Sequence, residues 1–367
     1  MGLRKILKKI IGNLSIKPKV STENYSNLRI GVAGAGTQGI LLSASAEQVG
    51  AKIVAVHDRK LVKARKLALL RKAELATADP DEFFKVKMDG LLLCTVPKIR
   101  TELIKRACKN NIHLLIEKPP AYNLIEGQEC LSAIEKAGVI TSVGFQLRYE
   151  PRYERLKQLI KGHVIHLVRT VCTVDYYLNF RMPDWFLKNE ASGGPIAEQA
   201  SHLLDIVRFV LGNPKATKAT SFGAKNMATD RMEFDAENSI QLIYELDNGV
   251  IGVHTNHCGH ERPCFDLELI GPHLRLEANA TEKTIHGMIN GQKINANIPD
   301  TTALGLNKVT AWLKAINTGE RNYLQSDYLE SLNTQSLIES AIKSRTTQRI
   351  EIIESVDSLK QTGQSKA

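Results

Sequence analysis

A short stretch in the middle of the chain carries side chains that can take up and release a proton. Glu198, His202 and Asp205 are spaced four and three residues apart, so they share one face of the helix that the pattern predicts over residues 196–211. Histidine is well suited to act as a general base near neutral pH. Taken alone, His202 is better explained as a helix histidine that bonds its own backbone, so a catalytic role requires further parts of a site.

A glycine-rich turn near the start of the chain supplies one such part. The residues Gly34-Ala35-Gly36-Thr37-Gln38-Gly39 follow an apolar run at 28–33, typical of a buried strand, and precede a helical stretch at 40–48. In this context the first glycine permits a tight turn, the second admits a pyrophosphate, and the third lets the helix pack on the strand. The N-terminus of the helix offers free N–H groups to the phosphates. The turn, with Thr37 and Gln38, therefore predicts a dinucleotide site.

The residues after the next apolar run bear on which dinucleotide binds. Asp58 lies 19 residues after Gly39 and follows the run 53–56. A carboxylate there accepts hydrogen bonds from the adenine ribose and repels a 2′-phosphate. Arg59 and Lys60 come next and would attract that phosphate. We expect NAD as the cofactor, with NADP as the alternative.

Strands and helices alternate over the first part of the chain, which favours βαβ units and a parallel sheet. Further strands are predicted at 88–95, 112–116 and 139–145, and helices at 62–75, 99–108 and 124–136, with Asp79 as the cap of a short helix. After Pro151 the strands follow one another instead. They are predicted at 166–177, 221–224, 238–245, 250–255, 265–270 and 274–278, with helices at 196–211, 307–317 and 329–343.

This order of elements predicts two domains of different class. We expect an α/β N-terminal Rossmann domain with a parallel sheet, and an α+β C-terminal domain with a mostly antiparallel open sheet and helices on one face. The predicted boundaries are a basic extension at 1–27, the dinucleotide-binding domain at 28–150, a substrate-binding and oligomerisation domain at 151–357, and a loose tail at 358–367.

The charge of the chain excludes one class of partner. The net charge is +10, from 49 basic and 39 acidic residues, and the residues before Gly31 contribute seven basic side chains against one acid. Because the remainder is nearly balanced, we do not expect a nucleic-acid binder. An anionic small molecule remains compatible with the charge. The sequence has no apolar run of the ~20 residues that a membrane helix needs.

The N-terminal segment has apolar residues at helical spacing with lysines between them. Residues 1–14 could form a basic amphipathic helix that makes weak contact with an anionic membrane surface. A helix packed on the protein, or a frayed extension, explains the same pattern. The six cysteines have no framework spacing and no secretory signal precedes them, so we expect reduced thiols and a cytoplasmic protein.

A cluster of histidines and cysteines raises the question of a metal. His254, His257, Cys258, His260 and Cys264 fall within eleven positions. Their spacing matches no familiar tetrahedral zinc site, and residues 254 and 257 point to opposite faces of a strand. We expect no metal ion.

Two more segments complete a recognisable pattern. Glu117-Lys118-Pro119 comes directly after a predicted strand, and residues 192–205 place Gly193-Gly194 ahead of Glu198 and His202. With the glycine-rich turn, Thr95-Val96-Pro97 and residues 144–149, they resemble the Gfo/Idh/MocA family. This family is named for glucose–fructose oxidoreductase, inositol dehydrogenase and the rhizopine-catabolism protein. The resemblance covers about residues 28 to 355.

The resemblance implies roles for individual residues. Lys118 would lie beside the nicotinamide ribose and contact the substrate hydroxyl, Glu117 would hold the ribose side of the cofactor, and Glu198 and His202 would face the nicotinamide. Many relatives carry Asp in place of Glu198. The remaining cofactor contacts implied are Thr95, Pro97 and Gln146. Residues 98–100 depart from a histidine-bearing stretch that the family often has.

Three further residues are candidates for the substrate pocket, together with His202. Trp185 is a candidate to stack on a sugar ring, with a place in the core as the equal alternative. Arg148 is a pocket residue or a core residue. Asp205 orients either its helix or the substrate.

Oxidation of a secondary alcohol removes a hydride, which the nicotinamide accepts, and a proton, which a side chain must accept. We assign the proton to His202 and the stabilisation of the developing alkoxide to Lys118, while the reverse assignment stays open. The predicted function is hydride transfer between NAD(P) and a hydroxyl or keto carbon of a sugar, cyclitol or nucleotide sugar. The alternatives are a redox-neutral NAD-dependent glycosidase of the same fold and a non-enzymatic dinucleotide-binding sensor. The resemblance also suggests a homodimer or homotetramer built through the open sheet face.

Overall fold

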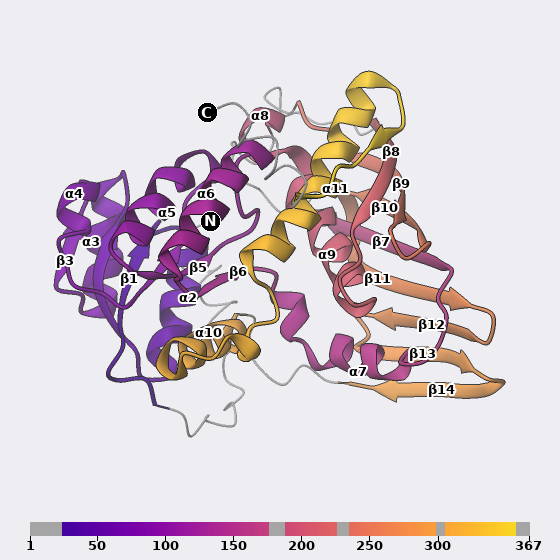
Figure 1. The fold of residues 1–367 in the computed structure, drawn as a ribbon, viewed down its shortest axis with the longest axis horizontal. Coiled ribbons are helices and arrows are strands. Elements are labelled where there is room, and N and C mark those ends of the chain that lie inside the picture. Colours follow the sequence, from indigo (N-terminus) through magenta and orange to yellow (C-terminus); the bar gives the residue numbers. More distant parts are fainter. Residues whose placement is uncertain (1–23, 176–187, 226–234, 299–304, 357–367) are drawn as a thin grey trace.

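The computed structural model describes residues 24–175, 188–225, 235–298 and 305–356, which form two domains side by side (Figure 1). Trp185, the N-terminal segment 1–14 and the predicted tail lie outside these residues. Among the described residues, no helix is both long enough and apolar enough to cross a bilayer.

The first domain is built on a parallel sheet. Within the described residues the sheet has six strands in the order β3-β2-β1-β4-β5-β6, and every neighbouring pair is parallel. The strands are β1 (Arg29–Ala33), β2 (Lys52–His57), β3 (Leu75–Thr77), β4 (Gly90–Leu93), β5 (His113–Ile116) and β6 (Thr141–Val143). Continuous apolar runs such as Leu91-Leu92-Leu93 are fully buried, as expected of strands covered on both faces. The predicted Rossmann class is confirmed.

Helices cover both faces of this sheet. Buried side chains of α2 and α3 pack in one core and those of α5 and α6 in another. The short helix α4 is capped by Asp79, whose side chain accepts a hydrogen bond from the backbone N–H of Asp81 at 2.7 Å, as the sequence predicts. The helices are α2 (Thr37–Gln48), α3 (Leu61–Arg71), α4 (Pro80–Phe83), α5 (Arg100–Lys109) and α6 (Leu124–Ala137), with short 3₁₀ turns η2 (Pro97–Ile99) and η3 (Gln146–Tyr149).

The second domain is an open, mostly antiparallel sheet. Its order among the described residues is β14-β13-β12-β11-β7-β10-β9-β8-β15, and the pair β10–β7 is parallel. The strands are β7 (Leu167–Asp175), β8 (Ala216–Ala224), β9 (Ser239–Leu246), β10 (Ile251–His257), β11 (Gly259–Gly271), β12 (Leu274–Asn279), β13 (Thr284–Ile289), β14 (Gln292–Asn297) and β15 (Glu351–Ile352). This confirms the predicted class of the second domain.

One face of the second sheet is covered by helices and the other is open (Figure 1). The covering elements are α7 (Pro151–Leu159), a π-helical turn η5 (Ile196–Ala200), α9 (Ser201–Val210) and α11 (Tyr328–Thr347). The short α8 (Asn189–Ser192) precedes η5. The open face exposes large apolar side chains at Leu167, Phe222, Ile243, Ile251 and Met288.

The chain returns to the first domain before it ends. Helix α10 (Leu306–Thr318) packs on α2, and Trp312 is fully buried there against Gly90. Helix α11 serves both domains, because Leu332 lies in the core of the first and Leu337 in the core of the second. Residues 306–318, assigned from the sequence to the second domain, therefore pack on the first.

Some elements differ from their predicted limits. The helix predicted at 62–75 ends at Arg71, because Lys72 adopts a left-handed backbone with φ of 53°, and the edge strand β3 follows. Strand β8 begins at Ala216, ahead of the predicted Ser221. Strands β13 and β14 are absent from the prediction.

Candidate functional site

The glycine-rich turn joins β1 to α2 and has the geometry that its glycines require. Gly34 has φ of +97°, and a Cβ there would lie 2.6 Å from the carbonyl of Cys94. A Cβ on Gly39 would lie 2.0 Å from the carbonyl oxygen of Gly34, so α2 packs on this turn only without a side chain. Among the described residues, apart from its two chain neighbours, a Cβ on Gly36 would meet no atom within 4 Å. That side of the turn therefore faces open space, which a phosphate can occupy.

The N-terminus of α2 suits an anion. Gly36 provides no side-chain cap, and the first turn carries no acidic residue. The first N–H groups of a helix have no partner inside it, and the helix dipole adds positive potential there. Thr37 and Gln38 are exposed at this end. A pyrophosphate fits this donor set.

Asp58 lies beside the same turn. One carboxylate oxygen accepts a hydrogen bond from the backbone N–H of Ala35 at 2.9 Å, and the other accepts one from the N–H of Lys60 at 2.9 Å. These bonds fix the carboxylate against the loop, and each oxygen keeps lone pairs for a ribose hydroxyl. The next residue, Arg59, is exposed and has no assigned contact in the described residues.

The parallel register brings the other predicted cofactor residues to this edge of the sheet. Ala33, Leu93 and Ile116 are aligned across β1, β4 and β5. The turns that follow these strands therefore meet, and they include Thr95 and Glu117. The hydroxyl of Thr95 is buried and has no hydrogen-bond partner among the described residues, so it is available to a bound cofactor.

A residue that the sequence did not single out holds two of these turns together. Arg100, at the start of α5, is buried and donates to the backbone carbonyls of Thr95, Glu117 and Pro119; its Nε–Thr95 distance is 2.9 Å. A guanidinium that replaces water at three carbonyls fixes both turns. The sequence drew attention to Arg100 only because residues 98–100 depart from the family pattern.

A second such residue is Lys308, in the first turn of α10. Its Nζ lies 2.5 Å from Oε1 of Glu117, and both side chains are buried, with 1% and 7% exposed. A Cβ on Gly144 would lie 2.9 Å from the other carboxylate oxygen. Glu117 is thus enclosed by Lys308 and the backbone at Gly144, and α10 is tied to the turn that carries Lys118.

Lys118 reaches across from the first domain to the second. Its Nζ donates to the carboxylate of Glu198 at 2.6 Å and to the backbone carbonyl of Glu198 at 2.6 Å. Glu198 lies in the π-helical turn η5, a local widening that occurs most often at functional sites. The ammonium group keeps a third N–H for a substrate oxygen. Gly193 and Gly194, both with positive φ, form the turn before η5.

His202 lies in the first turn of α9, directly after η5. Burial, reinforced by the positive charges of Lys118 and Lys308, holds the pKa of His202 well below its ordinary value. Its Nδ1 is buried and has no hydrogen-bond partner among the described residues. The imidazole is therefore neutral at physiological pH and able to accept a proton.

Arg148 and Asp205, candidates for the substrate pocket with a core place and a helix-orienting role as their alternatives, pair with each other. The guanidinium of Arg148 binds the Asp205 carboxylate through two hydrogen bonds of 2.7 Å, and neither side chain is exposed by more than 1%. Arg148 also donates to the carbonyl of Gln325 at 2.8 Å. Because both charged groups are used inside the protein, this pairing favours the alternatives that the sequence left open, a core place for Arg148 and an orienting role of Asp205 in its helix.

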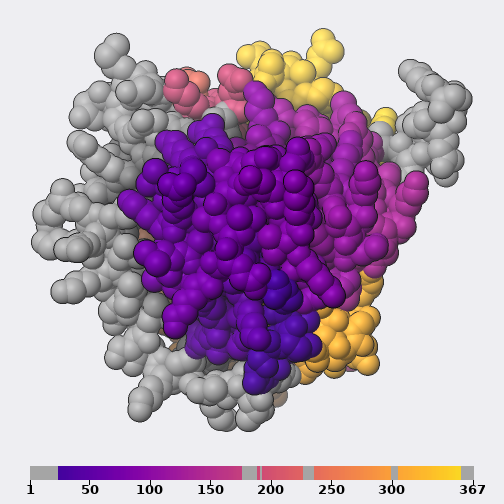
Figure 2. Space-filling view, turned by 90° about the vertical axis from the view of Figure 1, so that its left-hand side faces the viewer, coloured from indigo at the N-terminus to yellow at the C-terminus, as the bar shows by residue number. Residues whose placement is uncertain are grey.

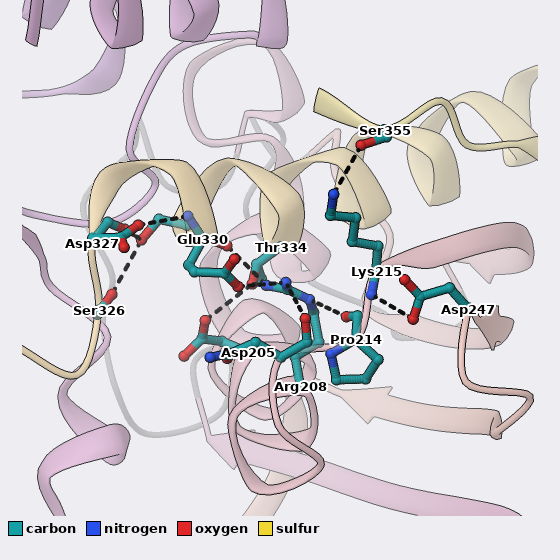
Figure 3. Close-up of polar contacts among 12 residues, drawn as sticks. Asp205, Arg208, Pro214, Lys215, Asp247, Ser326, Asp327, Glu330, Thr334 and Ser355 are labelled. Carbon is teal, nitrogen blue, oxygen red and sulfur yellow. Dashed lines mark hydrogen bonds and ion pairs between the residues drawn. The ribbon is translucent and has the colours of Figure 1, made fainter. Parts of the chain in front are cut away.

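The same network continues into α11 (Figure 3). The hydroxyl of Thr334 donates to Asp205 at 3.0 Å and accepts from Arg208 at 2.8 Å. Arg208 further donates to the carbonyl and the carboxylate of Glu330 at 2.8 and 2.9 Å, and to the carbonyl of Pro214 at 2.8 Å. The helix that carries His202 is therefore fixed by buried charged hydrogen bonds from three segments of the chain.

The remaining predicted residues are placed as follows. Pro97 is buried at the start of η2, and Gln146 is half-buried at the start of η3. The described residues contain no group of three or more side chains suited to hold a metal. Within the predicted histidine cluster, His254 is buried on the helix-covered face of β10, where Nδ1 lies 2.8 Å from the hydroxyl of Thr170. Burial lowers the pKa of His254 to about 3.

Fold and site together define a two-domain dinucleotide-binding protein, and comparison with known proteins agrees. Residues 28–145 match the model of the oxidoreductase family with an NAD-binding Rossmann fold, and residues 153–286 match the GFO/IDH/MocA C-terminal domain. The chain belongs to the GFO/IDH/MocA family. The resemblance drawn from the sequence is confirmed.

Individual relatives are distant. The chain is 24% identical over 237 residues to the uncharacterized oxidoreductase YrbE of Bacillus subtilis, covering 62% of this chain and 66% of the relative. It is 28% identical to scyllo-inositol 2-dehydrogenase (NAD(+)) of the same organism, covering 60% of this chain and 64% of the relative. The matched part is thus just under two thirds of these relatives' length. A solved structure of levoglucosan dehydrogenase with NADH and levoglucosan superposes with a TM-score of 0.79 at 14% identity, covering 89% of this chain and 99% of that one.

Proposed function

We propose that the protein transfers a hydride between NAD(P) and a hydroxyl or keto carbon of a sugar, cyclitol or nucleotide sugar. The observation that carries the proposal is the contact of Lys118 with Glu198 across the two domains, four residues ahead of a neutral His202 whose pKa Lys118 helps to lower. In the bound state the nicotinamide would supply the hydride acceptor. This chain's own groups would handle the substrate oxygen and its proton.

The residues divide the work as follows. Lys118 is held by two hydrogen bonds to Glu198 and directs its remaining N–H at the substrate oxygen, where it stabilises the developing alkoxide. His202 accepts the proton, and its lowered pKa keeps it unprotonated before the reaction. The names of the inositol and levoglucosan relatives support a polyhydroxylated ring as the substrate class.

The test is to incubate the purified protein with NAD or NADP and a panel of sugars, cyclitols and nucleotide sugars, and to measure the absorbance of reduced nicotinamide. Turnover with one class supports the proposal, and His202→Asn should reduce it by at least about a hundredfold. His166→Asn, the same change at an exposed histidine just before β7, is the matched control. Cofactor binding without net reduction for any substrate would favour the redox-neutral glycosidase or the sensor.

We also propose a cytoplasmic homodimer or homotetramer. The exposed apolar side chains on the open sheet face support association there, and six free thiols support a reducing compartment. Weak membrane contact through residues 1–14 stays a proposal from the sequence alone. Light scattering on the wild type and on Ile243→Glu tests the assembly, because a charge on the open face should shift the protein toward monomer.

A further inference from the structure

Helix α3 and its flanks form the most one-sided charged segment of the described chain. Residues 59–72 contain seven lysines and arginines and no acidic residue. The helix has neither an acid in its first turn nor a side-chain cap. A stable surface helix ordinarily mixes both signs, because opposite charges one turn apart support it.

The outer face of α3 has an apolar stripe. Ala64, Leu67 and Ala68 face the sheet and are buried. On the opposite side, Val62, Leu69 and Leu70 are 64%, 84% and 59% exposed. Their spacing of seven and eight residues places these three on a single stripe along the helix.

Basic side chains flank this stripe. Lys66 lies within it one turn after Val62, while Lys63 and Arg65 lie on its two sides by helical spacing, and all three are exposed. No ion pair joins any of them to another described residue. Arg71 differs, since it points inward and binds Glu47 at 2.9 Å. The positive charge of the outer face therefore lacks compensation within the described structure.

The position of α3 leaves its outer face accessible. In Figure 1 the helix lies with α4 and β3 at the outer margin of the first domain, far from the open sheet of the second domain. The N-terminal domain forms the front of Figure 2, which views the molecule from that side.

We propose that the exposed face of α3 docks on an anionic lipid surface. Val62, Leu69 and Leu70 enter the boundary between headgroups and acyl chains, and Lys63, Arg65 and Lys66 extend their apolar stems along it to reach the phosphates. An apolar stripe with basic flanks and no acid fits a bilayer of negative charge. A folded acidic protein would need a groove to receive an isolated helix face.

The experiment is flotation of the full chain, with NAD bound, on phosphatidylcholine vesicles and on vesicles that contain equal parts of phosphatidylglycerol. The protein should float with the anionic vesicles alone, and added salt should release it. Lys63→Glu/Lys66→Glu should lower binding by at least about 25-fold, since each basic residue contributes about fivefold. Leu69→Glu/Leu70→Glu should lower vesicle binding as well. Both positions are exposed, so their replacement leaves the core intact and the loss would not reflect unfolding.

Two controls separate this surface from general charge and from the N-terminal segment. Lys161→Glu/Lys293→Glu makes the same charge change on exposed residues of the second domain and should bind as the wild type does. A chain lacking residues 1–14 should still lose binding when α3 is altered. The proposal is overturned if the wild type does not bind anionic vesicles, or if the α3 variants bind them as the wild type does. It is also overturned if Lys161→Glu/Lys293→Glu loses as much binding as Lys63→Glu/Lys66→Glu, or if the protein binds polyglutamate through α3 in preference to lipid.

Discussion

Replacing Lys308 with methionine should destabilise the protein far more than its position outside the reacting groups suggests. Methionine keeps the length and apolar stem of lysine and removes the ammonium group. The carboxylate of Glu117 then loses the partner that lies 2.5 Å away, while its side chain stays 7% exposed. Water has little access to compensate the charge.

The expected cost follows from that burial. Removing one partner of a buried ion pair costs about 3 to 5 kcal/mol, a large part of the total stability of about 5 to 15 kcal/mol. We expect the lower half of that range, because the guanidinium of Arg100 stays close to the backbone of Glu117. The double variant Lys308→Met/Glu117→Gln removes both charges and should recover most of the loss.

Denaturant unfolding of the two single variants, the double variant and the wild type forms a cycle that measures the coupling. The matched control is Lys105→Met, because Lys105 and Glu129 lie 2.6 Å apart but are 43% and 51% exposed. Exposed pairs contribute about 0 to 1 kcal/mol. Equal losses for Lys308→Met and Lys105→Met, or a double variant no more stable than Lys308→Met, would refute the argument that burial makes this pair important.

Three more outcomes follow from the geometry. Gly36→Ala should leave unfolding unchanged but weaken NAD binding about ten- to hundredfold in a fluorescence titration, whereas Gly39→Ala, with its Cβ 2.0 Å from a carbonyl oxygen, should lower stability itself by about 1 to 3 kcal/mol. Asp58→Asn should raise the KM for NAD about ten- to hundredfold and reduce the ratio of kcat/KM for NAD to kcat/KM for NADP, both measured by initial-rate kinetics. An unchanged ratio would show that Asp58 does not select NAD. The folded pKa of His254, about 3, lies below its unfolded value of about 6.5, so its stabilising effect is complete above pH ~6.5 and is lost as the pH falls. Between about pH 7 and about pH 5 the wild type should thus lose about 2 kcal/mol more than His254→Asn, and parallel losses would show that this histidine is not the cause.

The fold was predictable wherever local pattern and burial agree. The strands of the first sheet are continuous apolar runs, and the glycine-rich turn requires glycine for reasons that its spacing already indicates. Strands β13 and β14 lie at the exposed end of the second sheet, where polar residues such as Lys293 and Asn295 alternate with half-buried ones. These segments form strands because they pair with β12 and with each other, and not because their own composition favours a strand. The return of α10 to the first domain depends on Trp312 filling the space above Gly90, a contact between residues more than two hundred positions apart.

The site likewise contains residues that the sequence predicted and residues that only the structure reveals. Motif and spacing selected Lys118, Glu198 and His202, and the structure brings the first two into contact. Helical spacing also selected Asp205, and the stretch 144–149 supplied Arg148, yet neither pattern could reveal that the two would pair with each other. Arg100 and Lys308 have no motif, because their roles arise from burial against the backbone of Thr95 and the carboxylate of Glu117. A charged side chain becomes informative only when its surroundings are known.

The supporting charges explain why the reacting groups can be few. Lys308 holds Glu117 from α10, and the Arg148–Asp205 pair holds α9 from the domain junction, so Lys118 and His202 approach each other from two separately fixed elements. Burial, reinforced by the positive charges of Lys118 and Lys308, keeps the imidazole of His202 unprotonated before the reaction. These cations therefore fix the geometry and add to the effect of burial on the base. The same cations stabilise the developing alkoxide, but they oppose the imidazolium that forms once His202 has accepted the proton.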